Sequence, residues 1–205
     1  MAETKSARRG YHHGDLRADL IAVVRALIES DGPDHVSIAE AARRAGVSSA
    51  APYKHFRDRT ALMNAVAADA MDRLRADMRA AADAHPAGSL AQISALGVAY
   101  VAFAVAQPGV FRLMFGLTEG HEDAPELLEK GEATFGIVIA AVAAYLGVAP
   151  DDPRAGQRAY MLWAFVHGHS FLWIDKKAKV SKVGLNDAAL IHAMSDAVLN
   201  RADPD

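Results

Sequence analysis

The 205-residue sequence contains no cysteine. This absence excludes disulfides, thiolate zinc sites and cysteine nucleophiles, and it fits a protein of the reducing cytoplasm. An apolar secretory segment is also missing, because the stretch from Met1 to Asp15 is polar and charged. From these absences we expect a cytoplasmic protein.

Charged side chains are missing from residues 84–111, which raises the question of a membrane segment. The continuous apolar part, Ala95 to Ala106, is only twelve residues long. A helix that spans a bilayer needs about 20. We therefore predict a buried core helix here and no membrane partner.

Patterns that indicate catalysis or metal binding are also absent. There is no glycine-rich phosphate loop, no nucleophile elbow and no pair of catalytic carboxylates. His167 and His169 are two residues apart, so on a helix they point in different directions and do not form a metal site. We expect no enzymatic activity, no metal and no cofactor.

Signals for β-strands are scarce, whereas alanine, the best helix former and a poor strand former, accounts for 44 residues. Apolar residues follow the helical repeat along the first expected helix, at Leu16, Leu20, Val23, Val24, Leu27 and Ile28. Similar patterns continue to residue 201. The predicted fold class is all-α, with a small N-terminal domain at residues 1–60 and a larger helical bundle at 61–205.

The charge balance differs between these two regions. Residues 1–60 hold ten Lys and Arg against eight Asp and Glu, a net charge of +2, whereas residues 61–205 hold twelve against seventeen, a net charge of −5. A basic N-terminal region on an acidic body favours a polyanionic partner for the N-terminal region only.

A helix-turn-helix pattern lies in the basic region. Ser37 and Glu40 have capping-box spacing at the start of a short helix that ends at Gly46. A second short helix is expected over Ser49 to His55, with Pro52 in its first turn, where the missing N–H costs little. Thr60 is expected to cap a long following helix. The pattern predicts a three-helix DNA-binding domain whose second short helix enters the major groove.

The side chains of this pattern suit contacts with DNA. The small residues Ser48, Ser49 and Ala51 allow a close approach to the groove, and longer side chains at Tyr53, Lys54 and His55 reach phosphates or bases. The helix start at Ser37 can bind a phosphate. The alternative is a plain helical hairpin in an all-helical protein.

The segment SIAEAARRAGVSSAAPYKHFRDRTAL, Ser37 to Leu62, resembles the N-terminal domain of the TetR family of bacterial transcriptional repressors. The resemblance implies that Tyr53 contacts a DNA phosphate, that His55 lies at the DNA interface, and that Arg59 supports the contact where that family usually has lysine. Pro52 also departs from the family pattern. The full set of candidate DNA-binding residues is Ser37, Ser48, Ser49, Ala51, Pro52, Tyr53, Lys54, His55, Arg59 and Thr60.

The segment WAFVHG, Trp163 to Gly168, resembles a W-x-x-x-H-G signature of one group of TetR C-terminal domains. Together the two resemblances imply a homodimeric repressor that responds to a small molecule and binds a near-palindromic operator. The alternative is a helical small-molecule-binding protein whose N-terminal domain contacts protein rather than DNA.

Aromatic and polar-tipped side chains on the most apolar helices of the body are candidates for an effector pocket, with plain core packing as the alternative. They predict a medium-sized, mostly apolar ligand. The candidates are Tyr100, Phe103, Phe111, Met114, Phe115, Phe135, Tyr160, Trp163 and His167.

The last two long helices carry apolar stripes that would form a four-helix interface between two copies of the chain, an arrangement that also resembles the family. A glycine in the middle of a helix costs about 1 kcal/mol relative to alanine, so Gly168 is expected where helices approach closely. The candidate interface residues are Gly168, Phe171, Leu172, Leu190, Ile191, Met194 and Val198.

Overall fold

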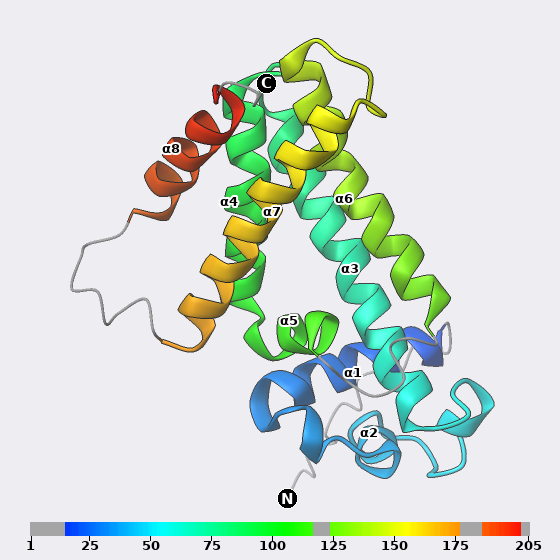
Figure 1. Ribbon diagram of the computed structural model, residues 1–205. Helices are drawn as coiled ribbons and strands as arrows, with labels where there is room; N and C mark the ends of the chain where they lie inside the picture. Colours follow the sequence, from blue (N-terminus) through cyan, green and yellow to red (C-terminus); the bar gives the residue numbers. More distant parts are fainter. Residues whose placement is uncertain (1–14, 117–123, 177–185, 202–205) are drawn as a thin grey trace, which may run out of the picture. The chain divides into compact units, whose positions relative to one another are not determined.

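The structure is a computed structural model, and its description covers residues 15–116, 124–176 and 186–201. Within these ranges the chain forms eight α-helices and two short 3₁₀ helices, with no strand (Figure 1). The predicted all-α fold is confirmed. The described residues divide into two compact units between Leu62 and Met63.

The first unit is built from α1 (Leu16–Asp31), η1 (Pro33–His35), α2 (Ile38–Arg44), η2 (Pro52–Lys54) and the first residues of α3 (Arg59–Asp83). Side-chain caps fix the starts of its helices, because Asp15 accepts from the Ala18 N–H at 3.2 Å and Ser37 accepts from the Glu40 N–H at 3.1 Å. The core of this unit includes the buried side chains of Leu20, Val24, Ile28, Ala41 and Phe56.

The second short helix of the helix-turn-helix differs from the prediction of a helix over Ser49 to His55. The structure shows turns followed by the three-residue 3₁₀ helix η2. Pro52 has no N–H to donate to the Ser48 carbonyl, so the first i→i−4 hydrogen bond of the predicted helix cannot form. The backbone instead closes i→i−3 bonds, from Ala51 to Ser48 at 3.0 Å and from His55 to Pro52 at 2.9 Å.

The long helix α3 also begins two residues earlier than predicted. The expectation that Thr60 caps this helix is wrong, because the helix begins at Arg59. The Asp58 carboxylate accepts from the Ala61 N–H at 2.8 Å and takes the capping role.

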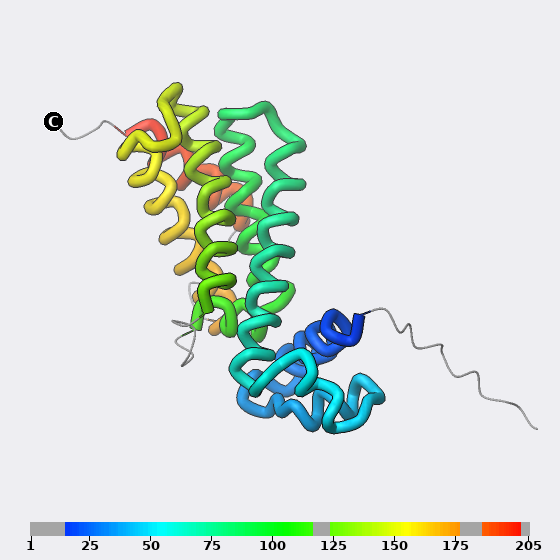
Figure 2. Tube along the Cα trace, turned by 90° about the vertical axis from the view of Figure 1, so that its right-hand side faces the viewer, coloured from blue at the N-terminus to red at the C-terminus, as the bar shows by residue number. Residues whose placement is uncertain are grey.

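The second unit contains the rest of α3 and five further described helices, which are α4 (Leu90–Ala106), α5 (Pro108–Phe115), α6 (Pro125–Leu146), α7 (Pro153–Ile174) and α8 (Asp187–Leu199). Helix α4 packs against both α7 and α8, and α6 packs against α7. Figures 1 and 2 show α3 beside α6, where the Lys130 Nζ atom pairs with Asp72 at 2.6 Å.

Helices α4 and α8 meet closely at Gly97. A Cβ atom at this position would lie 2.8 Å from the Ile191 Cγ2 atom and 3.3 Å from the Val166 Cγ1 atom, distances that leave no room for a side chain. Ile191 itself is only 1% exposed. Glycine at position 97 is therefore what allows α8 to lie against α4.

No described helix is by itself both long and apolar enough to cross a membrane. Helices α4 and α5 reach that length and apolarity only when taken together, and the chain bends by 110° between them.

Candidate nucleic-acid interface and ligand pocket

The turn after α2 positions the candidate DNA-binding side chains. Gly46 has φ +70°, a left-handed conformation that ends the helix, and the Val47 N–H donates to the Ala42 carbonyl at 3.0 Å. This is the hydrogen-bond pattern of a Schellman C-cap, which glycine favours. The turn directs the chain away from α2 and starts the segment that carries Ser48 to His55.

Most of the predicted DNA-binding side chains are exposed on the first unit. Tyr53 is 59% exposed, although large aromatic side chains are usually more buried than this. A phenol in that position is free to donate to a phosphate oxygen. Ala51 is half-buried, and the exposed members of the set are Ser37, Ser48, Ser49, Tyr53, Lys54, His55, Arg59 and Thr60.

Pro52 does not belong to this exposed set. It is fully buried in the first unit, so its side chain packs inside the protein and the assignment of Pro52 as a DNA contact is corrected. The ring is an apolar group on the inner side of the same short helix that exposes Tyr53.

Arg59 also has a role that differs from the predicted one. Its Nε atom donates to the Val36 carbonyl at 2.8 Å, and its Nη2 atom donates to the Pro33 carbonyl at 2.6 Å. Two of the guanidinium donors are thus used to hold the segment that precedes α2. We therefore assign Arg59 a role in positioning the start of α2, and its contact with DNA stays a prediction.

Two arginines at the end of α2 form a basic cluster that the sequence reasoning missed. The Glu40 carboxylate accepts from Arg43 Nη2 at 2.6 Å and from Arg44 Nε at 2.9 Å. These hydrogen bonds hold the pKa of Glu40 at about 2, well below its usual range. One carboxylate faces two guanidinium groups, so the cluster keeps a net positive charge. The two adjacent arginines, Arg43 and Arg44, are the sequence feature that could have predicted this cluster.

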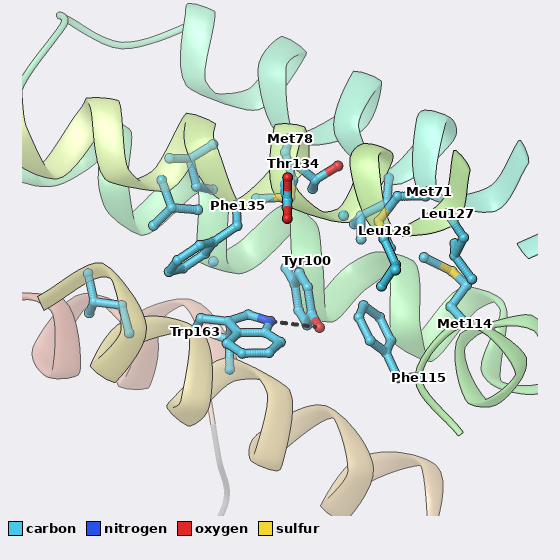
Figure 3. Close-up of a pocket in the computed structure, with 18 of the residues that line it drawn as sticks. Met71, Met78, Tyr100, Met114, Phe115, Leu127, Leu128, Thr134, Phe135 and Trp163 are labelled. Carbon is cyan, nitrogen blue, oxygen red and sulfur yellow. Dashed lines mark hydrogen bonds between the residues drawn. The ribbon is translucent and has the colours of Figure 1, made fainter. Parts of the chain in front are cut away.

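The second unit contains a cavity of about 400 Å³, lined by residues of α3, α4, α5, α6 and α7 (Figure 3). This volume lies in the range of small-molecule sites, about 300–1,000 Å³. Nearly all of its lining is apolar. The lining residues are Met71, Leu74, Met78, Ile93, Leu96, Gly97, Tyr100, Met114, Phe115, Leu127, Leu128, Gly131, Glu132, Thr134, Phe135, Val138, Leu162, Trp163 and Val166.

Five of the nine predicted effector residues line this cavity, namely Tyr100, Met114, Phe115, Phe135 and Trp163. The structure places the other four elsewhere. Phe103 and Phe111 are buried outside the lining, and Tyr160 is 58% exposed on the outer side of α7. His167 lies behind Tyr100, with which it shares a hydrogen bond. The assignment of Tyr160 to a buried pocket is therefore corrected: its ring contacts Trp163, with ring centroids 5.9 Å apart, but its side chain lies at the surface.

The polar groups at the wall of the cavity form one connected set. The Tyr100 hydroxyl shares a hydrogen bond of 2.8 Å with the His167 Nδ1 atom and accepts from the Trp163 Nε1 atom at 3.4 Å. Burial raises the pKa of the Tyr100 hydroxyl and lowers the pKa of His167 below 6.5. Tyr100 therefore stays protonated, and His167 is mostly neutral at pH 7.

The sequence reasoning missed the aliphatic part of the cavity wall. Met71, Leu74 and Met78 of α3 follow the helical repeat and share one face of that helix, and Leu127 and Leu128 come from the start of α6. Aliphatic residues at helical spacing are equally typical of a solid core. Which of them line a cavity is determined only by how the five helices pack.

The predicted dimer-interface residues fall into three groups. Gly168 and Leu172 are exposed on α7, and Phe171, Leu190 and Met194 are half-buried. Ile191 and Val198 are buried within the chain itself, so their assignment to a dimer interface is corrected. They point toward the helices of their own subunit, as the contact of Ile191 with Gly97 shows.

In the described part of the chain, no three His, Asp or Glu side chains come together in a way that could hold a metal ion.

Family models match both units. A model described as "Tetracyclin repressor-like, C-terminal domain" matches residues 93–198, more than half of the chain. A model described as "Bacterial regulatory proteins, tetR family" matches residues 20–66, which include the whole of the segment Ser37–Leu62. A search of the curated proteins found no match.

Solved structures share the fold. A protein of unknown function from Rhodococcus sp. RHA1 is 34% identical, with 94% of this chain and 97% of that chain covered and a TM-score of 0.78. A tetR-family transcriptional regulator from Streptomyces coelicolor is 18% identical, with 89% and 80% covered and a TM-score of 0.65. The TetR family regulator PfmR from Thermus thermophilus is 14% identical, with 90% and 99% covered and a TM-score of 0.62.

A helix-turn-helix unit joined to a helical unit with an apolar cavity defines a DNA-binding transcription regulator with a ligand-binding C-terminal domain. The chain belongs to the TetR family of bacterial regulatory proteins. Members of this family bind DNA and typically act as dimers.

Proposed function

We propose that the protein is a homodimeric repressor that binds a near-palindromic operator and is released from it by a mostly apolar small molecule. Residues 1–60 would form the DNA-binding domain and residues 61–205 the ligand-binding and dimerisation domain. The observation that carries the proposal is the course of α3, which begins at Arg59 and lines the cavity with Met71, Leu74 and Met78.

The proposed DNA contacts come from the exposed residues around the turn after α2. Tyr53, Lys54 and His55 would contact phosphates or base edges, and Ser48 and Ser49 would allow the backbone to approach the groove. Ser37 and Thr60 would reach the flanking phosphates. In a dimer, two such surfaces would contact sites about 34–36 Å apart, or a multiple of that distance.

Release would follow from the effect of a ligand on α3. A molecule that fills the cavity touches one face of this helix, and it shifts the protein toward the released state only by its difference in affinity for the two states. A movement of α3 would change the distance between the two DNA-binding domains of the dimer.

Binding to the DNA immediately upstream of the protein's own coding region, at two salt concentrations, tests the proposal. We expect tighter binding than to a scrambled fragment at both concentrations. Tyr53→Ala and Lys54→Gln should weaken binding, and Lys54→Gln should lower the salt slope by about one. Lys176→Gln, which removes an exposed cation from the other unit, is the matched control.

Each outcome discriminates between the functions. Loss of DNA binding in the Tyr53 and Lys54 variants, with the dimer intact, supports the repressor. A wild-type protein without salt-dependent affinity for any DNA fragment would overturn it and favour a helical binding protein whose N-terminal domain contacts another protein.

A further inference from the structure

The charge of the cavity wall restricts the ligand. Among the described residues that line the cavity there is no lysine, arginine or histidine, and the single ionisable acid or base besides Tyr100 is Glu132 of α6. Lys130, on the same helix, lies outside the lining, and its ammonium group pairs with Asp72 at 2.6 Å and Glu126 at 3.0 Å. The part of the wall that the structure describes therefore offers no cation to an anionic ligand.

The hydrogen-bond donors of the wall are also largely used. The Thr134 hydroxyl donates to the Lys130 carbonyl at 2.7 Å, and the Trp163 Nε1–H donates to the Tyr100 oxygen at 3.4 Å. The Tyr100 hydroxyl either donates to His167 or, in the other tautomer of the imidazole ring, accepts from it. The cavity thus provides at most one neutral O–H donor to a ligand.

Acceptors and aromatic faces, in contrast, are available. The oxygens of Thr134 and Tyr100 each retain accepting capacity, and the exposed Glu132 carboxylate has no ion pair within the described ranges. The rings of Phe115, Phe135 and Trp163 line the same cavity (Figure 3), and aromatic faces attract cations. The wall is therefore complementary to a donor group and to positive charge.

We propose, on the basis of the proposed ligand-responsive function, that the cavity binds a hydrophobic molecule whose polar group is a hydrogen-bond donor without negative charge, an alcohol or an amine. It rejects carboxylates and phosphate esters of the same hydrocarbon skeleton. A buried anion needs several donors or a cation to replace its hydration, and this wall has neither.

Three ligands that differ only in the head group test the proposal. Decanol, decylamine and decanoate are titrated into the full-length protein at neutral pH, below their micelle concentrations, with tryptophan fluorescence and the shift in melting temperature as two independent readouts. We expect decanol and decylamine to bind at least tenfold more tightly than decanoate. Equal or tighter binding of decanoate would overturn the proposal, and so would the absence of binding by all three to the folded protein.

Variants of Glu132 test the charge at the cavity. Glu132→Gln should lower the affinity for decylamine by about two- to fivefold, which is the contribution expected of an exposed charge pair, and should leave the affinity for decanol unchanged. Glu132→Lys should raise the affinity for decanoate and lower that for decylamine. Glu129→Gln and Glu129→Lys change an exposed acid of the same helix outside the lining and serve as matched controls. Equal effects at both positions would contradict a role of Glu132.

Binding to the upstream DNA is measured on the same preparations, which separates the two proposals. If decanol or decylamine releases the protein from the operator and decanoate does not, the result supports both the repressor function and the ligand preference. If the protein prefers decanol and decylamine but binds no DNA fragment, the proposed ligand preference stands and the proposed repressor function is overturned.

Discussion

Arg59 and Ser37 act on the same short piece of backbone at the start of α2. Ser37 caps the helix through the Glu40 N–H, and Arg59 holds the two carbonyl oxygens of Pro33 and Val36 just before it. At the scale of single residues, the orientation of the helix-turn-helix therefore depends on hydrogen bonds between side chains and backbone. Each of these bonds can be removed without touching the exposed Tyr53 and Lys54.

The Arg59→Ala variant should lower the free energy of unfolding by about 1 kcal/mol, because two hydrogen bonds from a charged group are lost at a partly exposed site. Urea denaturation measures this change. Arg57→Ala, which removes a guanidinium group that pairs with the adjacent Asp58, should change stability by less than about 0.5 kcal/mol. Equal effects of the two substitutions would argue against the positioning role of Arg59.

His167 gives the second unit a defined pH dependence. Burial lowers its pKa below the ordinary 6.5, so the folded state favours the neutral ring. Its contribution to stability is fully present above pH 6.5 and is lost as the pH falls from 6.5 through the folded-state pKa.

The melting temperature should therefore fall as the pH decreases from 7 to 5, and the fall should be smaller in His167→Gln, which does not titrate. The two pH profiles measured side by side check this prediction. The Glu40 carboxylate does not interfere, because its stabilising pairs with Arg43 and Arg44 are lost only as the pH falls through 4.5 toward about 2. Parallel profiles for the wild type and His167→Gln would contradict the prediction.

The contact between α4 and α8 shows how a helix–helix distance depends on one missing side chain. Gly97 allows the Ile191 side chain to come within 2.8 Å of the place where a Cβ atom would be, and Val166 of α7 lies 3.3 Å from the same place. At the scale of elements, this position brings α4, α7 and α8 together and also lines the cavity.

Gly97→Ala should destabilise the protein by about 1–3 kcal/mol, because the added methyl group overpacks a buried contact. Gly136→Ala is the matched control, since this glycine lies within α6 with no atom within 4 Å of an added Cβ. It should stabilise the protein by up to about 1 kcal/mol through the higher helix propensity of alanine. Denaturant titrations of both variants give the comparison, and a neutral Gly97→Ala would show that α8 adjusts freely.

The outer side of α7 bears on the assembly of the whole molecule. Within the described ranges, an added Cβ at Gly168 would meet no atom of another segment within 4 Å, so no close approach among these residues explains this glycine. Leu172, one turn further, is 48% exposed. An exposed apolar leucine one turn from a glycine suits the proposed contact with a second copy.

Leu172→Glu should raise the dissociation constant of the dimer at least tenfold, because it would bury a carboxylate without a partner in the interface. Sedimentation velocity over a range of concentrations measures the dissociation constant. Val105→Glu, which places the same charge at a 50% exposed apolar position on α4, should leave the dimer unchanged. A dimer that tolerates Leu172→Glu would place the interface elsewhere on the molecule.

The sequence by itself determined the long helices and the place of the helix-turn-helix, although not the 3₁₀ form of its second short helix, because periodicity, caps and turn residues act over a few neighbouring positions. Leu20, Val24 and Ile28 are buried as their spacing predicts, and Ser37 caps α2 as expected. The resemblance of Ser37–Leu62 to the TetR family rested on the same local pattern. These features need no knowledge of distant contacts.

The tertiary structure alone decided which side chains face inward where the local pattern allows either direction. Pro52 and Tyr53 are adjacent, yet one is buried and the other exposed, and Ile191 packs on Gly97 rather than on a second copy. The aliphatic wall of the cavity, likewise, has no local signature. Each of these outcomes depends on contacts between segments far apart in the sequence, and such contacts form only when the helices pack together.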